Sequence, residues 1–183
     1  MKDLKFCFNS KFPDVNKVKF IVVGDNPGET EYKENRYFIG SSGTSLKNFF
    51  EKNGWVEDFY EECFIFNKTV IHTNKTPELR PIKIAHPDLF NEIQIKSAQQ
   101  ILETAKEYAL PILVFGKTEI RKNGVFSEFW KELNKSEDAN IYVFNHPSNS
   151  TFMKAAYNVF GKENLISKEE LLSWGADNKK LVL

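Results

Sequence analysis

Four short apolar segments stand out along the chain, and polar residues hardly interrupt them. Runs of this kind, rich in β-branched and aromatic residues without strict alternation, favour strands that are buried on both faces, as in a parallel sheet. We therefore predict four strands, at residues 18–23, 64–67, 111–115 and 141–145.

Helical patterns lie between and after these strands. The longest spans residues 87–109, where Pro87 suits a first turn and apolar residues recur at helical spacing. Ser167 and Glu170 form a capping box that opens the last helix. The other predicted helices span residues 44–53, 125–133, 151–160 and 167–174. Alternating strands and helices predict an α/β protein, a three-layer α/β/α sandwich with a central four-stranded, mainly parallel sheet. No linker divides the chain, so we expect one domain over residues 1–183.

Polar and titratable residues follow every predicted strand. Ligands of open α/β sheets bind beyond the carboxyl ends of the strands, so these residues are candidates for a shared site. They are residues 24–28 (Gly-Asp-Asn-Pro-Gly), Asn67, residues 116–118 (Gly-Lys-Thr), and His146 with Ser148.

Two of these segments carry the chemistry that we weigh first. Residues 24–28 form a tight turn by composition, and such turns are most often only structural. As a rigid loop, the same turn would hold Asp25 and Asn26 toward a substrate, where they can orient water or stabilise a cation. His146 alone is more often a packing or capping residue. A neutral imidazole N–H facing a cleft can also stabilise an anionic leaving group.

Residues 37–45 contain an aromatic residue and a pair of serines, and each of these two features allows two interpretations. Phe38 is either a core residue or a face on which a planar base stacks. Ser41 and Ser42 precede a predicted helix, where they would cap it or bind a phosphate together with its N–H groups. The Gly-Lys-Thr at 116–118 resembles the end of a nucleotide-triphosphate loop, but that pattern needs a glycine where Pro111 stands, so an ATPase is not favoured.

Composition narrows the function classes. With 25 Lys and Arg against 25 Asp and Glu, the net charge is zero, which excludes a strongly basic nucleic-acid coat protein. The two cysteines, Cys7 and Cys63, are too few for a four-thiolate zinc site or an iron–sulfur cluster. No apolar stretch has the length of a signal or a membrane span, so we expect a soluble, cytoplasmic protein without a membrane partner. Basic residues near the strand ends form either a solvated face or a track for a phosphate backbone: Lys33, Arg36, Lys68, Lys75, Arg80, Lys83, Lys117, Arg121 and Lys122.

In this order, the motifs resemble the uracil-DNA glycosylase superfamily over roughly residues 19–160. Residues 24–28 are similar to the family's first motif, and His146-Pro147-Ser148 is similar to its second. The resemblance implies that Phe38 stacks on a flipped base and that Asn67 recognises the uracil edge. It further implies that His146 stabilises the departing anion, while Asp25 or Asn26 positions water.

The resemblance implies a monofunctional DNA glycosylase of base excision repair that hydrolyses the N-glycosidic bond of uracil or a related deaminated base. We expect a monomer without metal or organic cofactor, and Phe152 or Met153 as a wedge in the duplex. The residues expected at the DNA backbone are Ser41, Ser42, Ser148 and Ser150. Asn26 and Gly28 occupy places where another branch has an Asp and a thymine-blocking Tyr, so exclusion of thymine is not assured.

Two other function classes stay open on the sequence. The first is a glycosylase-like module that binds nucleic acid or a nucleobase with weak or no catalysis. The second is a small-molecule hydrolase that uses Ser148 with His146. That hydrolase is disfavoured, because the two residues are close together on a turn and no Gly-x-Ser-x-Gly elbow is present.

Overall fold

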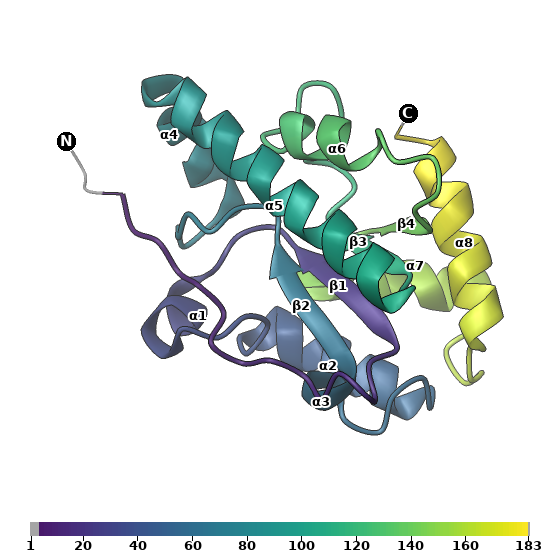
Figure 1. Cartoon of the computed structure of the whole chain (residues 1–183). Helices are drawn as coiled ribbons and strands as arrows, with labels where there is room; N and C mark the ends of the chain where they lie inside the picture. Colours follow the sequence, from purple (N-terminus) through teal and green to yellow (C-terminus); the bar gives the residue numbers. More distant parts are fainter. Residues whose placement is uncertain (1–3, 183) are drawn as a thin grey trace.

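The computed structural model describes residues 4–182, apart from the side chain of residue 149. At its centre lies a sheet of four parallel strands in the order β2-β1-β3-β4 (Figure 1). The strands are β1 (Phe20–Gly24), β2 (Cys63–Asn67), β3 (Ile112–Phe115) and β4 (Ile141–Phe144). All four predicted strands are present, with ends shifted by one or two residues, and the α/β class is confirmed.

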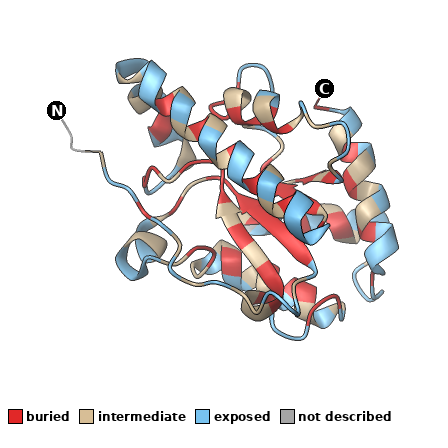
Figure 2. Ribbon diagram, viewed as in Figure 1, coloured by how far each residue is buried: buried red, intermediate tan, exposed pale blue. Residues whose placement is uncertain are grey.

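Both faces of the sheet are buried, which explains the unbroken apolar segments. In β1, Phe20 and Val22 pack into one core, whereas Ile21 and Val23 pack into a second core on the opposite face. The strands are accordingly coloured mostly as buried in Figure 2. Strand β2 forms one edge of the sheet, and its Phe64 and Phe66 are only partly buried.

Helices cover both faces and complete the three layers (Figure 1). One face carries α2 (Ser41–Lys52), α3 (Phe59–Glu62), α7 (Thr151–Phe160) and α8 (Lys168–Lys180). The opposite face carries α4 (Leu79–Ala85), α5 (Pro87–Tyr108) and α6 (Ser127–Leu133). The loops after β1, β2 and β4 contain α1 (Glu29–Glu34) and two short 3₁₀ helices, η1 (Thr76–Glu78) and η2 (Ser148–Ser150).

Helix bounds differ from the prediction where local capping decides them. Helix α2 begins at Ser41 rather than residue 44, so Ser41 and Ser42 lie in its first turn and Gly40 is its N-cap. The capping box of Ser167 and Glu170 is confirmed, but α8 continues past the predicted end to Lys180. Among residues 4–182, no helix has both the length and the apolar character needed to cross a bilayer.

The strand order places the site. The chain passes from β1 to β2 on one side and then returns across the sheet to β3 on the other side of β1. The carboxyl ends of β1 and β3 therefore adjoin where the connections switch direction, which is the usual position of a ligand site in an open sheet. The loop after β4 reaches the same edge.

Candidate active site

A cavity of about 610 Å³ opens at the carboxyl ends of the strands. Its walls come from the loops after β1, β2 and β4 and from the first turns of α1 and α2. The sequence-predicted residues that line it are Asp25, Asn26, Phe38, Ser41, Ser42, Asn67, His146 and Ser148. Ser150 does not line this cavity; it is exposed, has a left-handed backbone and precedes α7.

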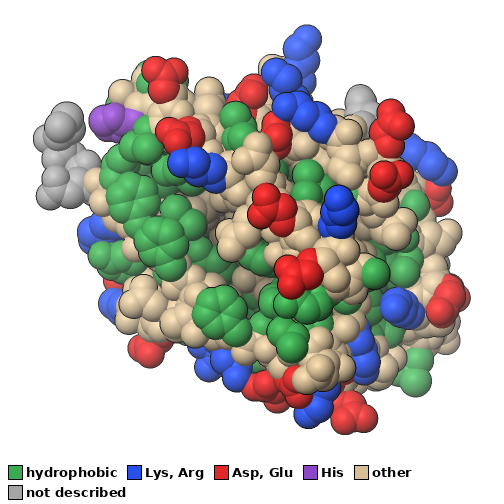
Figure 3. All heavy atoms as spheres, in the orientation of Figure 1, with side chains coloured by type: hydrophobic (Ala, Val, Ile, Leu, Met, Phe, Trp, Pro, Cys, Tyr) green, Lys and Arg blue, Asp and Glu red, His purple; other side chains and the backbone are tan. Residues whose placement is uncertain are grey.

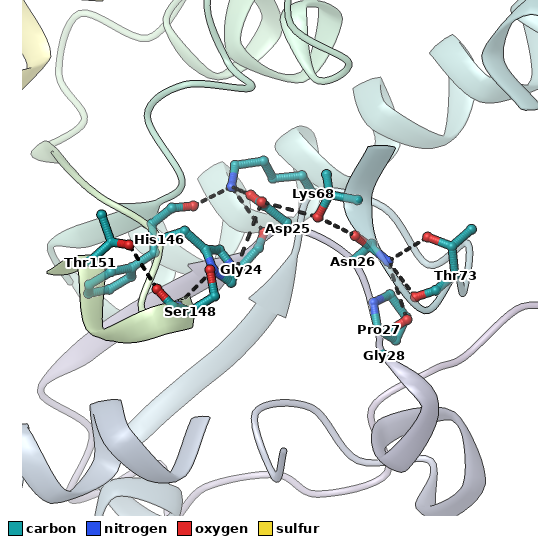
Figure 4. Close-up of polar contacts among 12 residues, drawn as sticks. Gly24, Asp25, Asn26, Pro27, Gly28, Lys68, Thr73, His146, Ser148 and Thr151 are labelled. Carbon is teal, nitrogen blue, oxygen red and sulfur yellow. Dashed lines mark hydrogen bonds and ion pairs between the residues drawn. The ribbon is translucent and has the colours of Figure 1, made fainter. Parts of the chain in front are cut away.

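Asp25 forms a buried ion pair with Lys68. Asp25 is 7% exposed, and the Nζ of the fully buried Lys68 lies 2.5 Å from Asp25 Oδ1 (Figure 4). Lys68 also donates to the backbone carbonyls of Gly24, at 3.2 Å, and Phe115. Burial lowers the pKa of Lys68, and the adjacent Asp25 carboxylate opposes that shift. Each charge offsets part of the cost of burying the other, and removing either one would leave an uncompensated buried charge.

His146 faces the other oxygen of the same carboxylate. Its Nε2 lies 3.9 Å from Asp25 Oδ2, too far for a direct hydrogen bond. The Ser148 backbone N–H donates to His146 Nδ1 at 3.1 Å, so the neutral ring carries its hydrogen on Nε2 (Figure 4). Partial burial lowers the pKa of His146; Asp25 counteracts this shift and Lys68 reinforces it. The site thus holds a neutral imidazole whose N–H can act as a donor.

The Asn26 side chain is already occupied by the loop after β2. Its Nδ2 donates to the backbone carbonyl and the hydroxyl of Thr73, at 3.1 and 3.0 Å (Figure 4). Its Oδ1 accepts from the Thr76 hydroxyl at 3.0 Å. These contacts tie the loops after β1 and β2 together, and they leave the amide less free to orient water than the sequence suggested.

Phe38 is held in an unusual backbone conformation. Its φ of 57° is left-handed, which is rare for a bulky residue and indicates local strain. The Phe38 N–H donates to Glu31 Oε1 at 3.1 Å, and the Tyr60 hydroxyl donates to the Phe38 carbonyl at 2.8 Å. The other Glu31 oxygen accepts from the Gly28 N–H at 2.6 Å. Glu31 therefore joins the first motif to the aromatic wall of the cavity.

Asn67 lies beside Phe38 at the end of β2. A methyl group on Gly24 would come within 2.3 Å of the Phe38 ring and 2.5 Å of Asn67 Oδ1, so only glycine fits between them. Asn67 is 5% exposed, and its Nδ2 has no hydrogen-bond partner among the described residues. A buried amide donor without a partner costs free energy, and a ligand in the cavity would relieve that cost.

The first turn of α2 offers polar groups at the cavity rim. Ser41 and Ser42 both line it, together with Gly40 and Gly43. No acidic residue stands in that turn, so its N–H groups and partial positive charge are available to an anion. Lys75, in the loop after β2, is a cationic residue on the same cavity wall.

Two sequence expectations are wrong. Lys68 cannot contact a phosphate backbone, because it is fully buried against Asp25. Phe152 and Met153 cannot be wedge residues in this conformation, because both pack in the core at 0% and 9% exposure. Apolar residues at helical spacing in α7 face the sheet rather than the solvent.

The wider basic track is only partly free. Arg80 pairs with Glu119 at 3.0 Å, and Lys83 donates to the Val125 carbonyl. Side chains of both charge signs are interspersed over the face shown in Figure 3. Part of the expected phosphate track is therefore already engaged within the protein.

Sequence patterns did not indicate Glu31 and Thr76, which bond to the Gly28 N–H and to Asn26. Lys68 was expected on the phosphate track, and its pairing with Asp25 was not foreseen. Gly116 was among the candidates after the third strand, and it packs on Asp25, as a glycine directly after a strand often does where backbones approach closely. Over the part of the chain that the structure describes, no group of three or more His, Cys, Asp or Glu side chains has the arrangement of a metal site.

Comparison with known proteins agrees with the motif order. A family model described as the uracil DNA glycosylase superfamily matches residues 11–166. A comparison with curated proteins found no match. The matched region spans most of the chain and contains every predicted residue that lines the cavity. The chain therefore belongs to the uracil DNA glycosylase superfamily.

Proposed function

We propose that this protein is a DNA glycosylase that hydrolyses the N-glycosidic bond of uracil, or of a related deaminated base, in DNA. The observation that carries the proposal is the unpartnered, buried amide of Asn67 in a cavity that Phe38 and His146 also line. An amide can bind the polar edge of a pyrimidine, an aromatic ring can stack on its face, and a neutral imidazole can donate to the departing anion.

Recognition of the base follows from the first two groups. The glycosidic bond is hidden in the stack, so the nucleotide must be extruded before it can react. Phe38 would hold the extruded ring by stacking, which requires no hydrogen-bond match. Asn67 would donate to uracil O4 and accept from N3–H, a pattern that cytosine does not offer.

Cleavage follows from His146 and Asp25. When the bond between C1′ and N1 breaks, its electron pair leaves on uracil and the sugar becomes an oxocarbenium-like cation. The Nε2–H of neutral His146 would donate to uracil O2 and stabilise the anion. Asp25 Oδ2 would stabilise the cation and accept a proton from the water that adds to C1′.

The DNA strand would be held at the cavity rim. The N–H groups of the first turn of α2, with Ser41 and Ser42, suit a phosphate beside the extruded nucleotide. Ser148 and Lys75 line the same cavity and would contact neighbouring backbone groups. With a zero net charge overall, few cationic contacts supply the binding, so the affinity should be modest and should fall as salt rises.

Cleavage of uracil-containing oligonucleotides tests the proposal. Single- and double-stranded substrates are incubated with the protein at low salt, and abasic sites are revealed by alkaline strand cleavage. Wild type should produce abasic sites, and Asn67→Ala and His146→Ala should each be slower by about 100-fold or more. Wild type that yields no abasic product at high protein concentration would contradict the proposal.

A binding module without turnover is the second candidate, and one observation favours it. The Asn26 amide is bonded to Thr73 and Thr76, and one Asp25 oxygen is bonded to Lys68, so little of the first motif is free to activate water. Tight binding of a uracil oligonucleotide without any abasic product would support this candidate over the enzyme.

A further inference from the structure

We infer that Lys68 is a positioning residue for catalysis: it binds one oxygen of the Asp25 carboxylate and so fixes the other oxygen toward the cavity. The inference rests on the proposed function and assigns a role to a residue outside the motifs on which the family resemblance was based.

Three acceptors surround the Lys68 amine. They are Asp25 Oδ1 and the carbonyl oxygens of Gly24 and Phe115. An ammonium group has three N–H donors and a neutral amine has two, so this set of acceptors matches the charged form. The face of the Phe126 ring, whose centroid lies 5.3 Å from Nζ, also favours a cation.

These contacts connect three strand ends. Gly24 ends β1, Phe115 ends β3, and Lys68 follows the last residue of β2. The backbone N–H of Lys68 also donates to the backbone carbonyls of Gly24 and Asp25, at 3.0 and 3.1 Å. Asp25 is thereby fixed to the rigid part of the sheet rather than to a loop.

The orientation of the carboxylate follows from this arrangement. With Oδ1 on Lys68, Oδ2 faces Thr76 Oγ1 at 3.5 Å and His146 Nε2 at 3.9 Å. Gly116 closes the remaining side, where a methyl group would come within 2.3 Å of Oδ1. Lys68 itself is fully buried, so it does not contact DNA. Its effect on the reaction must pass through Asp25.

A double-mutant cycle tests this role. Maximum single-turnover rates and half-saturating protein concentrations are measured on a uracil oligonucleotide for wild type, Asp25→Asn, Lys68→Met and the double variant. Lys68→Met should lower the maximum rate about 100-fold, because a displaced carboxylate loses the reactive geometry. The half-saturating concentration should stay within about twofold, because no DNA contact is removed.

The decisive comparison is Asp25→Asn against the double variant. If Lys68 acts only through Asp25, the two rates are equal within about twofold, because the second substitution removes nothing further. This comparison also covers the case in which Lys68→Met alone does not fold, since that variant leaves a buried carboxylate without its counter-charge. A double variant at least tenfold slower than Asp25→Asn would overturn the inference.

Lys19→Met is the matched control. Lys19 pairs with the buried carboxylate of Glu62 at 2.5 Å, at the amino ends of β1 and β2, far along the same strands from the cavity. The Lys19→Met variant should have a changed midpoint of thermal unfolding and an unchanged maximum single-turnover rate. A rate loss in Lys19→Met as large as that in Lys68→Met would show a general effect of stability and overturn the inference. Wild type without any cleavage would instead overturn the proposed function, and with it the role of Lys68.

Discussion

Gly116 lies directly against the carboxylate of Asp25, where a methyl group would sit 2.3 Å from Oδ1. Its φ of 99° is also one that other residues rarely adopt. We expect Gly116→Ala to lose about 1–2 kcal/mol of unfolding free energy through backbone strain, and to cleave about 100-fold more slowly because Asp25 must move. Chemical denaturation and single-turnover rates measure the two effects separately.

Gly54→Ala is the control that separates the effect of backbone strain from the effect of displacing Asp25. Gly54 also has a positive φ, of 70°, but nothing lies within 4 Å of an added methyl group. This variant should show a similar stability loss and an unchanged rate. If Gly116→Ala and Gly54→Ala cleave at equal rates, cleavage does not require the close packing of Gly116 on Asp25, and the prediction is wrong.

Glu31 should control binding through Phe38. The carboxylate accepts from the Phe38 and Gly28 N–H groups at once, whereas a glutamine has a single acceptor oxygen. We expect Glu31→Gln to release Phe38 from its strained backbone and to raise the half-saturating protein concentration about tenfold, through weaker base stacking. Titration of cleavage against protein concentration measures the change.

Glu34→Gln is the control for this prediction. Glu34 is the last residue of the same helix α1 and is exposed. The substitution removes the same charge from α1 without affecting Phe38. An equal rise of the half-saturating concentration in Glu34→Gln would mean that charge, rather than the bond to Phe38, sets the binding.

The pH dependence should follow His146. Burial lowers the pKa of His146 below its usual 6.5, so the unfolded chain binds more protons than the folded one between the two values. The contribution of His146 to stability is therefore full above pH 6.5 and is lost as the pH falls toward the lowered pKa. Protonation also converts Nδ1 from acceptor to donor and breaks its bond to the Ser148 N–H.

Two measurements check this behaviour. The maximum single-turnover rate of wild type should decline in acid with a midpoint below 6.5, and this step should be absent in His146→Gln. The stability difference between wild type and His146→Gln should shrink over the same range. A midpoint above 6.5, or an identical acid step in both proteins, would contradict the burial of a neutral imidazole.

Much of the frame could be predicted from sequence because the sheet is buried on both faces. Continuous apolar segments predicted the four strands, and most of the polar residues predicted from the strand ends line the cavity. Helix α5 was found nearly to the residue, since its 22 residues carry a clear period. The short helices α1 and α3 were missed, because six and four residues give too little periodicity. Helix α4 was missed because it contains Pro81, and a proline usually marks a turn or a helix end in sequence patterns.

Residues that act through tertiary contacts escaped the sequence analysis for physical reasons. A lysine after a strand is usually solvated, and only the three-dimensional packing shows that Lys68 turns inward to Asp25. Glu31 belongs to a short helix whose sequence gives no sign that it bonds to Phe38. Phe152 was assigned to the surface, although its large apolar side chain stabilises the core when buried.

The most direct test of the account is discrimination between uracil and cytosine in one sequence context. The Asn67 amide should accept from N3–H and donate to O4 of uracil, so wild type should release uracil faster than cytosine by a factor of about 10⁴. Asn67→Leu, which removes both polar groups, should lose most of this preference. Release of cytosine at a comparable rate, or a preference that survives Asn67→Leu, would contradict the claim that this cavity recognises a deaminated pyrimidine.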